Sequence, residues 1–313
     1  MKFIVIIIGI LLLRRMGSLS WLQRDGWYRQ WVVSLHKRQW LDSKPTVRLL
    51  VLLLVPLFLL IVTLLLMDNR WFGIPVFILS LWVFLYSLGR GDLEEEIDGY
   101  RDDLRRDDLQ AAYHDAAEFN AAKKMGTSEN WSELHDEVVG ALSYRYFERY
   151  FAVIFWFVLA GAPGALLYRL LVLHSEMPVP IGADKSGVNA VDTNASNMNR
   201  VLHGLHIMEW LPVRVMGLSL AFVGNFTACL DSLRVSLFSG SVSTLDVIRS
   251  YVLAALASGS IKSANAVYEV PEEVEEKVSV KREAEAEVAE IRALFSRALM
   301  LALCLVAFLV ILL

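Results

Sequence analysis

The charged side chains that stand in apolar surroundings are the residues of this chain best suited to chemistry. Arg169 and Arg214 each lie among leucine and valine residues, and Glu209 comes five positions before Arg214. Ionisable groups at membrane depth usually pair with one another or line a polar cavity. We therefore predict that Glu209 bonds Arg214 or Arg169. The three side chains then form either a structural clamp between two membrane-embedded segments or a polar pocket for a ligand or partner.

Two further groups contain residue types that bind metals. His203 and His206 can share a helix face, but Glu209 is turned away from them and no other third ligand is near. We therefore favour histidines at a membrane boundary over a metal site. Glu94–Glu96 with Asp98 could gather a divalent cation, yet side chains in a continuous helix diverge around its axis, which favours a solvated charged face. We expect neither a metal nor a cofactor.

Other familiar catalytic and binding signatures are absent from the sequence. It has no phosphate-binding G-x-x-x-x-G-K-[ST] loop, no G-x-G-x-x-G before a helix and no G-x-S-x-G nucleophile elbow. A net charge of −4 and a pI near 5.9 argue against a nucleic-acid partner. Of the two cysteines, Cys229 and Cys304, the second lies in an apolar run, which argues against a disulfide framework. These observations favour a protein without catalytic activity.

The elements that must position the charged residues are membrane helices. Leu49–Met67 and Trp71–Leu88 are 19 and 18 residues long and contain no charge. A helix of 19 residues is about 28 Å long, close to the hydrocarbon thickness of a bilayer. The pair therefore predicts a membrane hairpin over residues 49–88.

The two ends of the chain are also apolar. Phe3–Leu13 has the length of a signal-peptide core, but its positive charges mostly follow the apolar run, so we expect a retained short helix that is embedded or spanning. Ala298–Leu313 holds 16 residues. This run spans only if the bilayer thins or if Leu294–Arg297 contribute to the helix.

The middle of the chain contains apolar segments with helix breakers. Within Phe151–Leu173, the strongest cluster of breakers contains Gly161, Pro163 and Gly164. The segment is either one kinked span or a re-entrant pair of short helices. We favour the re-entrant pair because it places Arg169 near the polar boundary.

The following stretches are more polar. Ser175–Asn199 is rich in proline, glycine and asparagine and predicts a long loop. Val201–Phe226 is interrupted by Glu209, by the breaker Pro212 and by Arg214, which argues against a simple lipid-facing span.

Together these patterns predict an all-α, multi-pass integral membrane protein with broken or re-entrant helices and a cytoplasmic helical portion. Lysines and arginines exceed acids by eight to two between Arg14 and Arg48, which places residues 14–48 in the cytoplasm and, after the hairpin, residues 89–150 as well. The expected segments are a membrane part (1–88), charged cytoplasmic helices (89–150), broken membrane segments with a polar loop (151–228), cytoplasmic helices (229–297) and a C-terminal membrane helix (298–313).

The chain resembles the AmpE family of bacterial inner-membrane proteins. The specific blocks are Phe151–Phe157 with Gly161–Arg169, and Glu209–Arg214; Gln23–Tyr28 and Tyr86–Asp92 support them. The resemblance implies a multi-pass inner-membrane protein tied to β-lactamase regulation and the antibiotic response. It also implies partnership with a cytoplasmic AmpD-like muropeptide amidase in peptidoglycan recycling.

The same blocks are similar to the CobD/CbiB family of cobalamin-pathway synthases. Members of that family carry acidic and asparagine residues around these blocks, where this chain has Ser143–Arg149, Leu170–Glu176 and Met208-Glu209. Most groups that could hold magnesium and phosphates are therefore missing. We favour a non-catalytic signalling component of the β-lactamase and peptidoglycan-recycling system that is embedded in the lipid bilayer. Two alternatives stay open: a diverged ATP-dependent synthase and a small-molecule transporter.

Overall fold

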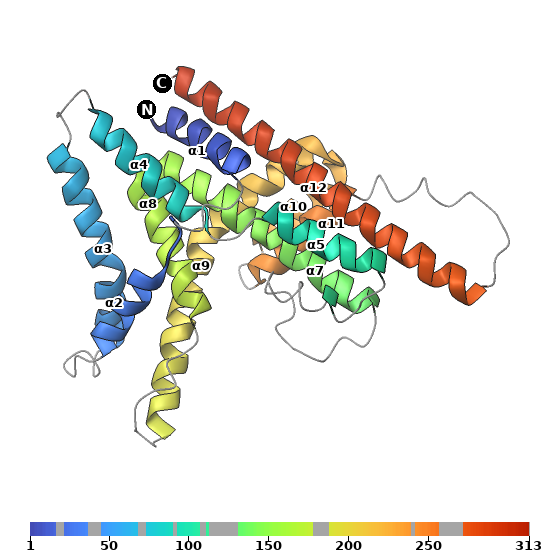
Figure 1. The fold of residues 1–313 in the computed structure, drawn as a ribbon, viewed down its shortest axis with the longest axis horizontal. Helices are drawn as coiled ribbons and strands as arrows, with labels where there is room; N and C mark the ends of the chain where they lie inside the picture. Colours follow the sequence, from blue (N-terminus) through green and yellow to red (C-terminus); the bar gives the residue numbers. More distant parts are fainter. Residues whose placement is uncertain are drawn as a thin grey trace. The chain divides into compact units, whose positions relative to one another are not determined.

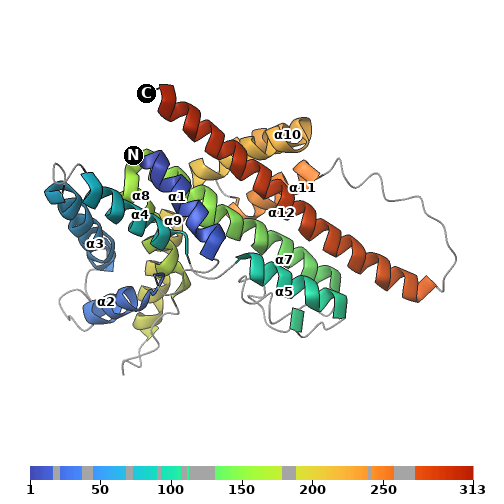
Figure 2. The same cartoon turned by 45° about the horizontal axis from the view of Figure 1, so that its top comes forward.

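The computed structural model describes residues 1–16, 22–36, 45–67, 73–89, 93–106, 111–112, 131–177, 188–238, 242–256 and 272–312. Within these ranges the regular structure is helical and contains no strand (Figure 1 and Figure 2). Four segments are long and apolar enough to cross a membrane: Thr46–Met67, Glu137–Glu176, Met198–Val223 and Ala284–Phe308. The all-α membrane class expected from the sequence is confirmed.

The chain forms two compact units. Unit 1 contains Met1–Gly91 and Ala152–Glu209, and unit 2 contains Asp92–Phe151 and Trp210–Leu313. The helices of unit 1 are α1 (Lys2–Met16), α2 (Gly26–His36), α3 (Pro45–Met67), α4 (Ile74–Ser87), α8 (Val153–Glu176) and the first part of α9 (Val188–Val223).

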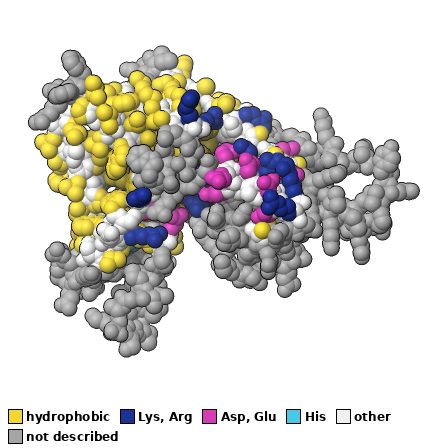
Figure 3. Space-filling model, viewed as in Figure 1, with side chains coloured by type: hydrophobic (Ala, Val, Ile, Leu, Met, Phe, Trp, Pro, Cys, Tyr) yellow, Lys and Arg dark blue, Asp and Glu magenta, His cyan; other side chains and the backbone are white. Residues whose placement is uncertain are grey.

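The two uncharged stretches of the sequence form α3 and α4, which pack against each other and against α8. Their outer surfaces are apolar: Leu54, Phe58, Leu65 and Leu66 on α3 and Ile78 and Trp82 on α4 are all about half exposed or more. Figure 3 shows hydrophobic side chains gathered over the face of unit 1 that carries these two helices. A surface of this kind is stable in contact with lipid rather than water.

Helix α1 is part of the packing of unit 1, where it contacts α4 and α8. Val5, Ile6, Ile10 and Leu13 on one of its faces are buried. A methyl group added at Gly9 would lie 2.6 Å from a ring carbon of Phe84, so α1 and α4 approach closely there. Helix α1 therefore contributes to the buried core of unit 1.

Helix α8 is broken at the expected glycine. Gly161 has φ 72° and ψ −159°, a conformation that only glycine adopts readily. Pro163 follows in the first turn of the second segment, where proline's missing N–H is tolerated. A side chain at Gly164 would lie 2.7 Å from the carbonyl oxygen of Trp156, because the chain folds back closely after the break.

Helix α9 differs from the sequence-based expectations in two ways. It begins at Val188, so residues 188–199, which we expected in a loop, are helical. The prolines and glycines that suggested the loop all precede Val188. The helix also continues through Pro212, so the expected break at this residue is wrong.

A side chain from another helix explains why α9 tolerates Pro212. Proline lacks the N–H that would bond the carbonyl four positions earlier, which belongs to Met208. The indole N–H of Trp156 donates a hydrogen bond of 3.1 Å to that carbonyl oxygen. Membrane helices accept proline when a neighbour satisfies the freed backbone group in this way.

Unit 2 is built around long α12 (Glu272–Leu312), which contacts α5 (Leu93–Arg106), α7 (Trp131–Tyr146) and α11 (Thr244–Leu256). The unit also contains α10 (Phe226–Phe238), the second part of α9, and most of a π-helical turn, Phe147–Ala152. Because α12 is continuous, Leu294–Arg297 do extend the apolar C-terminal run, and the candidate span becomes Ala284–Phe308.

Ion pairs connect α12 to α5 along their polar faces. Arg292 pairs with Glu94 and with Asp98, the latter at 3.3 Å. Glu285 accepts hydrogen bonds from Arg101 at 3.1 Å and from Nε of Arg105 at 2.9 Å. The acidic side chains at the start of α5 therefore serve helix packing as well as solvation. Figure 3 shows charges of both signs close together over α5.

Candidate functional site

A buried ion pair between Asp25 and Arg169 is the centre of the candidate site. One carboxylate oxygen of Asp25 lies 3.6 Å from Nη2 of Arg169, and the other accepts a hydrogen bond of 3.2 Å from the hydroxyl of Tyr86. All three residues are at most 5 % exposed. Burial of charged groups is costly unless they are paired and hydrogen-bonded; Asp25 meets both conditions here, and Arg169 is paired.

The chain before α2 positions Asp25. Its backbone carbonyl accepts hydrogen bonds from the N–H groups of Tyr28 and Arg29, which starts the first turn of α2. Two residues earlier, the side-chain amide of Gln23 donates a hydrogen bond of 3.1 Å to the carbonyl oxygen of Leu85 near the end of α4. Local backbone geometry and one bond to α4 therefore fix the direction of the Asp25 carboxylate.

The end of α4 positions the groups around Arg169. The indole N–H of Trp27 donates 3.0 Å to the hydroxyl of Tyr86, which in turn donates to Asp25. Gly89 has φ 80°, and a methyl group at this position would lie 3.2 Å from Nη1 of Arg169. Glycine therefore suits the backbone conformation, and a side chain at this position would be in tight contact with the guanidinium.

A second tyrosine extends the cluster along α8. The hydroxyl of Tyr28 is 3.3 Å from Nδ1 of His174. Burial, with a smaller contribution from Tyr86, raises the pKa of the Tyr28 phenol above its usual value. The phenol therefore stays protonated and can donate to Nδ1 when that nitrogen is the acceptor.

Glu209 is held by the residue that precedes Arg169. The hydroxyl of Tyr168 donates 3.2 Å to a carboxylate oxygen of Glu209, which is 3 % exposed. This contact joins α8 and α9 within unit 1. The pairing of Glu209 with Arg169 or Arg214 stays a prediction.

Arg214 lies in unit 2 and bonds backbone carbonyls. Its two terminal nitrogens donate to the carbonyl oxygens of Trp210 at 2.8 Å and Ser236 at 2.9 Å. The guanidinium also lies 4.4 Å from the ring centroid of Trp210. Ser236 is in the last turn of α10, where the helix dipole favours a positive charge. These contacts hold α9 against α10 and fit a structural role.

Sequence reasoning therefore found Arg169 but missed its partner Asp25 and the hydroxyl of Tyr86. A signal was available, because both residues stand in the supporting blocks of the resemblance, Gln23–Tyr28 and Tyr86–Asp92. His203 is exposed on α9. The blocks around Asp25, Tyr86 and Arg169 are distant in the sequence and meet in one buried cluster, which ties the second segment of α8 to the end of α4 and the start of α2.

The profile of a family described as "Regulatory signalling modulator protein AmpE" matches residues 22–297. Over 173 residues the chain is 24% identical to "Protein AmpE" from Shigella flexneri, a match covering 53% of this chain and 56% of that protein. The match thus spans little more than half the length of this curated relative. No solved structure matches the chain. Because the family profile covers most of the chain and all the residues of the buried cluster, this membrane protein belongs to the AmpE family of regulatory signalling modulators.

Proposed function

We propose that this protein is an inner-membrane component of the system that controls β-lactamase induction and peptidoglycan recycling. It acts together with a cytoplasmic muropeptide amidase of the AmpD type and catalyses no reaction itself. The observation that carries the proposal is the buried pair of Asp25 and Arg169, which together with Tyr86 joins three separate family-like blocks within a regulatory family.

The geometry of this pair suits a switch. Arg169 lies on the second segment of α8, after the break at Gly161. A glycine conformation connects the two segments, so the second segment can change its angle with little distortion of the first. A ligand that weakens the bond between Asp25 and Arg169 would favour this change. The bond is therefore the bistable contact in the proposed mechanism.

The charged face of unit 2 suits a protein partner. Residues 89–150 carry many acids, and α5 presents both acidic and basic side chains along α12. Mixed charges of this kind set the orientation and specificity of a protein contact more than its strength. We place the contact with the amidase on this face.

The test is β-lactamase activity in the native host, measured across a range of inducer with the gene deleted and then restored. We expect deletion to shift the induction curve and the unaltered gene to restore it. Asp25→Asn should fail to restore it at equal protein level. Arg29→Gln is the control, because Arg29 is exposed on α2 one turn beyond Asp25.

An unchanged induction curve after deletion would refute the signalling proposal. Metabolite profiling of the deletion strain would then test for a missing enzymatic product. If deletion shifts the curve and Asp25→Asn restores it fully, the protein has a regulatory role, but the buried cluster takes no part in that role. Capture of the amidase by the purified full chain, weakened by charge reversal at exposed Arg105, would support the partner. Capture that is unchanged by this reversal would move the contact away from α5.

A further inference from the structure

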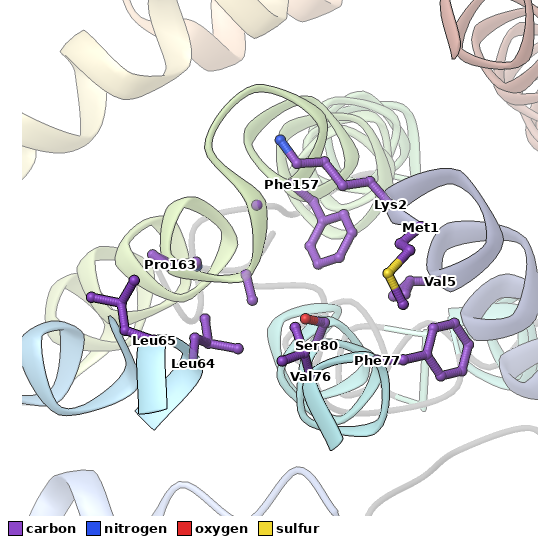
Figure 4. Close-up of a pocket in the computed structure, with 12 residues that line it drawn as sticks. Met1, Lys2, Val5, Leu64, Leu65, Val76, Phe77, Ser80, Phe157 and Pro163 are labelled. Carbon is purple, nitrogen blue, oxygen red and sulfur yellow. The ribbon is translucent and has the colours of Figure 1, made fainter. Parts of the chain in front are cut away.

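An apolar pocket of about 280 Å³ lies in unit 1 beside the break in α8. Its lining comes from α1, α3, α4 and α8 and includes Leu64, Leu65, Val76, Phe77 and Phe157. Figure 4 shows these side chains around an open space, with Phe157 and Pro163 on the two sides of the break. The pocket is half open and its lining is mostly apolar, so a hydrocarbon chain fits it better than a polar metabolite.

One charged side chain borders this pocket. Nζ of Lys2 donates a hydrogen bond of 3.0 Å to the carbonyl oxygen of Val158, near the end of the first segment of α8. An ammonium group has three donors, so this bond leaves others available. In the part of the chain that the structure describes, no carboxylate pairs with Lys2. A positive charge beside hydrocarbon is stabilised by an anion.

We propose that the pocket binds one acyl chain of an anionic phospholipid and that Lys2 binds the phosphate of the same molecule. A zwitterionic lipid offers the same hydrocarbon but neutralises its phosphate with its own ammonium, so Lys2 makes the site selective for the anionic headgroup. The site is not implied by family membership. The family match begins at residue 22, whereas Met1 and the α1 residues Lys2 and Val5 form one side of the pocket.

The test uses the purified full chain in detergent, stripped of lipid and then offered phosphatidylglycerol or phosphatidylcholine with identical acyl chains. Native mass spectrometry measures the lipid retained. We expect preferential retention of phosphatidylglycerol. Lys2→Gln should lower that retention about fivefold, as expected for the loss of one basic contact at a membrane surface, and Lys2→Arg should preserve it. Equal retention of both lipids by the unaltered chain, or a preference that survives Lys2→Gln, would overturn the proposal.

A second variant tests the acyl chain. Val76→Trp fills the pocket and should lower the retention of both lipids, whereas Leu59→Trp, on an exposed lipid-facing part of α3, should leave it unchanged. Full retention by a folded Val76→Trp would place the lipid elsewhere and refute the site. Lys2 is exposed at the start of α1, so the headgroup test is readable even if Val76→Trp does not fold.

Discussion

Asp25 and Arg169 are buried together in unit 1, and the charge of each is stabilised by the charge of the other. Their separation of 3.6 Å and the added bond from Tyr86 offset the loss of hydration. A pair of this kind contributes little net stability compared with apolar residues, but loss of one partner leaves an uncompensated buried charge. The cluster is consequently well suited to specify one arrangement of α8 and to change when its charges are disturbed.

Asp25→Asn should destabilise the folded protein by about 3–5 kcal/mol, because Arg169 keeps its charge and loses its carboxylate. The double variant Asp25→Asn with Arg169→Met should lose less stability than the sum of the losses in the two single variants. Unfolding in detergent measures all four members of the cycle. Strict additivity would mean that the two residues do not depend on each other.

Trp156→Phe should destabilise the protein by about 0.6–1.7 kcal/mol, the range for a hydrogen bond between membrane helices. The indole N–H satisfies the Met208 carbonyl that Pro212 leaves without a helical partner. Trp82→Phe is the matched control, because Trp82 is half exposed on α4. The double variant Trp156→Phe with Pro212→Ala should recover the loss, since alanine restores the helical N–H. If the double variant is as unstable as Trp156→Phe alone, the bond from Trp156 does not compensate for the N–H that Pro212 lacks.

At the scale of elements, the features carried by continuous local sequence were predictable. Two apolar helices, α3 and α4, follow from two uncharged runs, although α4 covers only Ile74–Ser87 and is shorter than the spanning segment expected there. The break in α8 follows from the breaker cluster at Gly161. The continuity of α9 through Pro212 was not predictable, because it depends on Trp156, which lies on another helix. The same reason hid Asp25, whose partner is brought near only by the packing of α2, α4 and α8.

Gly161→Ala should destabilise the protein by about 1–3 kcal/mol, because the conformation at Gly161 is almost closed to residues with a side chain. Gly204→Ala is the control, since a methyl group there would meet only Leu171, at 3.8 Å. Thermal unfolding of the two variants in the same detergent gives the comparison. Equal stability of both would argue that the break does not depend on glycine.

At the scale of the whole molecule, the sequence predicts a topology with residues 14–48 and 89–150 in the cytoplasm. The basis is the distribution of lysine and arginine, a property of the chain and not of any one helix. If α8 is a re-entrant pair of helices, the residues that follow it return to the cytoplasmic side. If it is a single span, they lie on the opposite side.

The test uses a chain in which Cys229 and Cys304 are replaced and single cysteines are placed at Met177 and Met198. We expect these cysteines to react with an impermeant maleimide only after the cytoplasmic face of the membrane is exposed. Arg29→Cys marks the cytoplasmic side for comparison. Labelling of the two test positions in intact cells, with Arg29→Cys protected, would instead establish α8 as a span. Labelling of Arg29→Cys in intact cells would reverse the predicted topology.

The continuity of α12 has a mechanical consequence. A bilayer that becomes thinner makes a long apolar helix tilt. The stretch from Glu272 to Ala284 precedes the candidate span and is about 18 Å long, so a tilt of about 10° around Ala284 moves its far end sideways by about 3 Å. The ion pairs of Glu285 and Arg292 join α5 to the first turns of the span itself. We therefore expect a change in membrane thickness, and with it in lipid composition or lateral tension, to shift the charged face of unit 2.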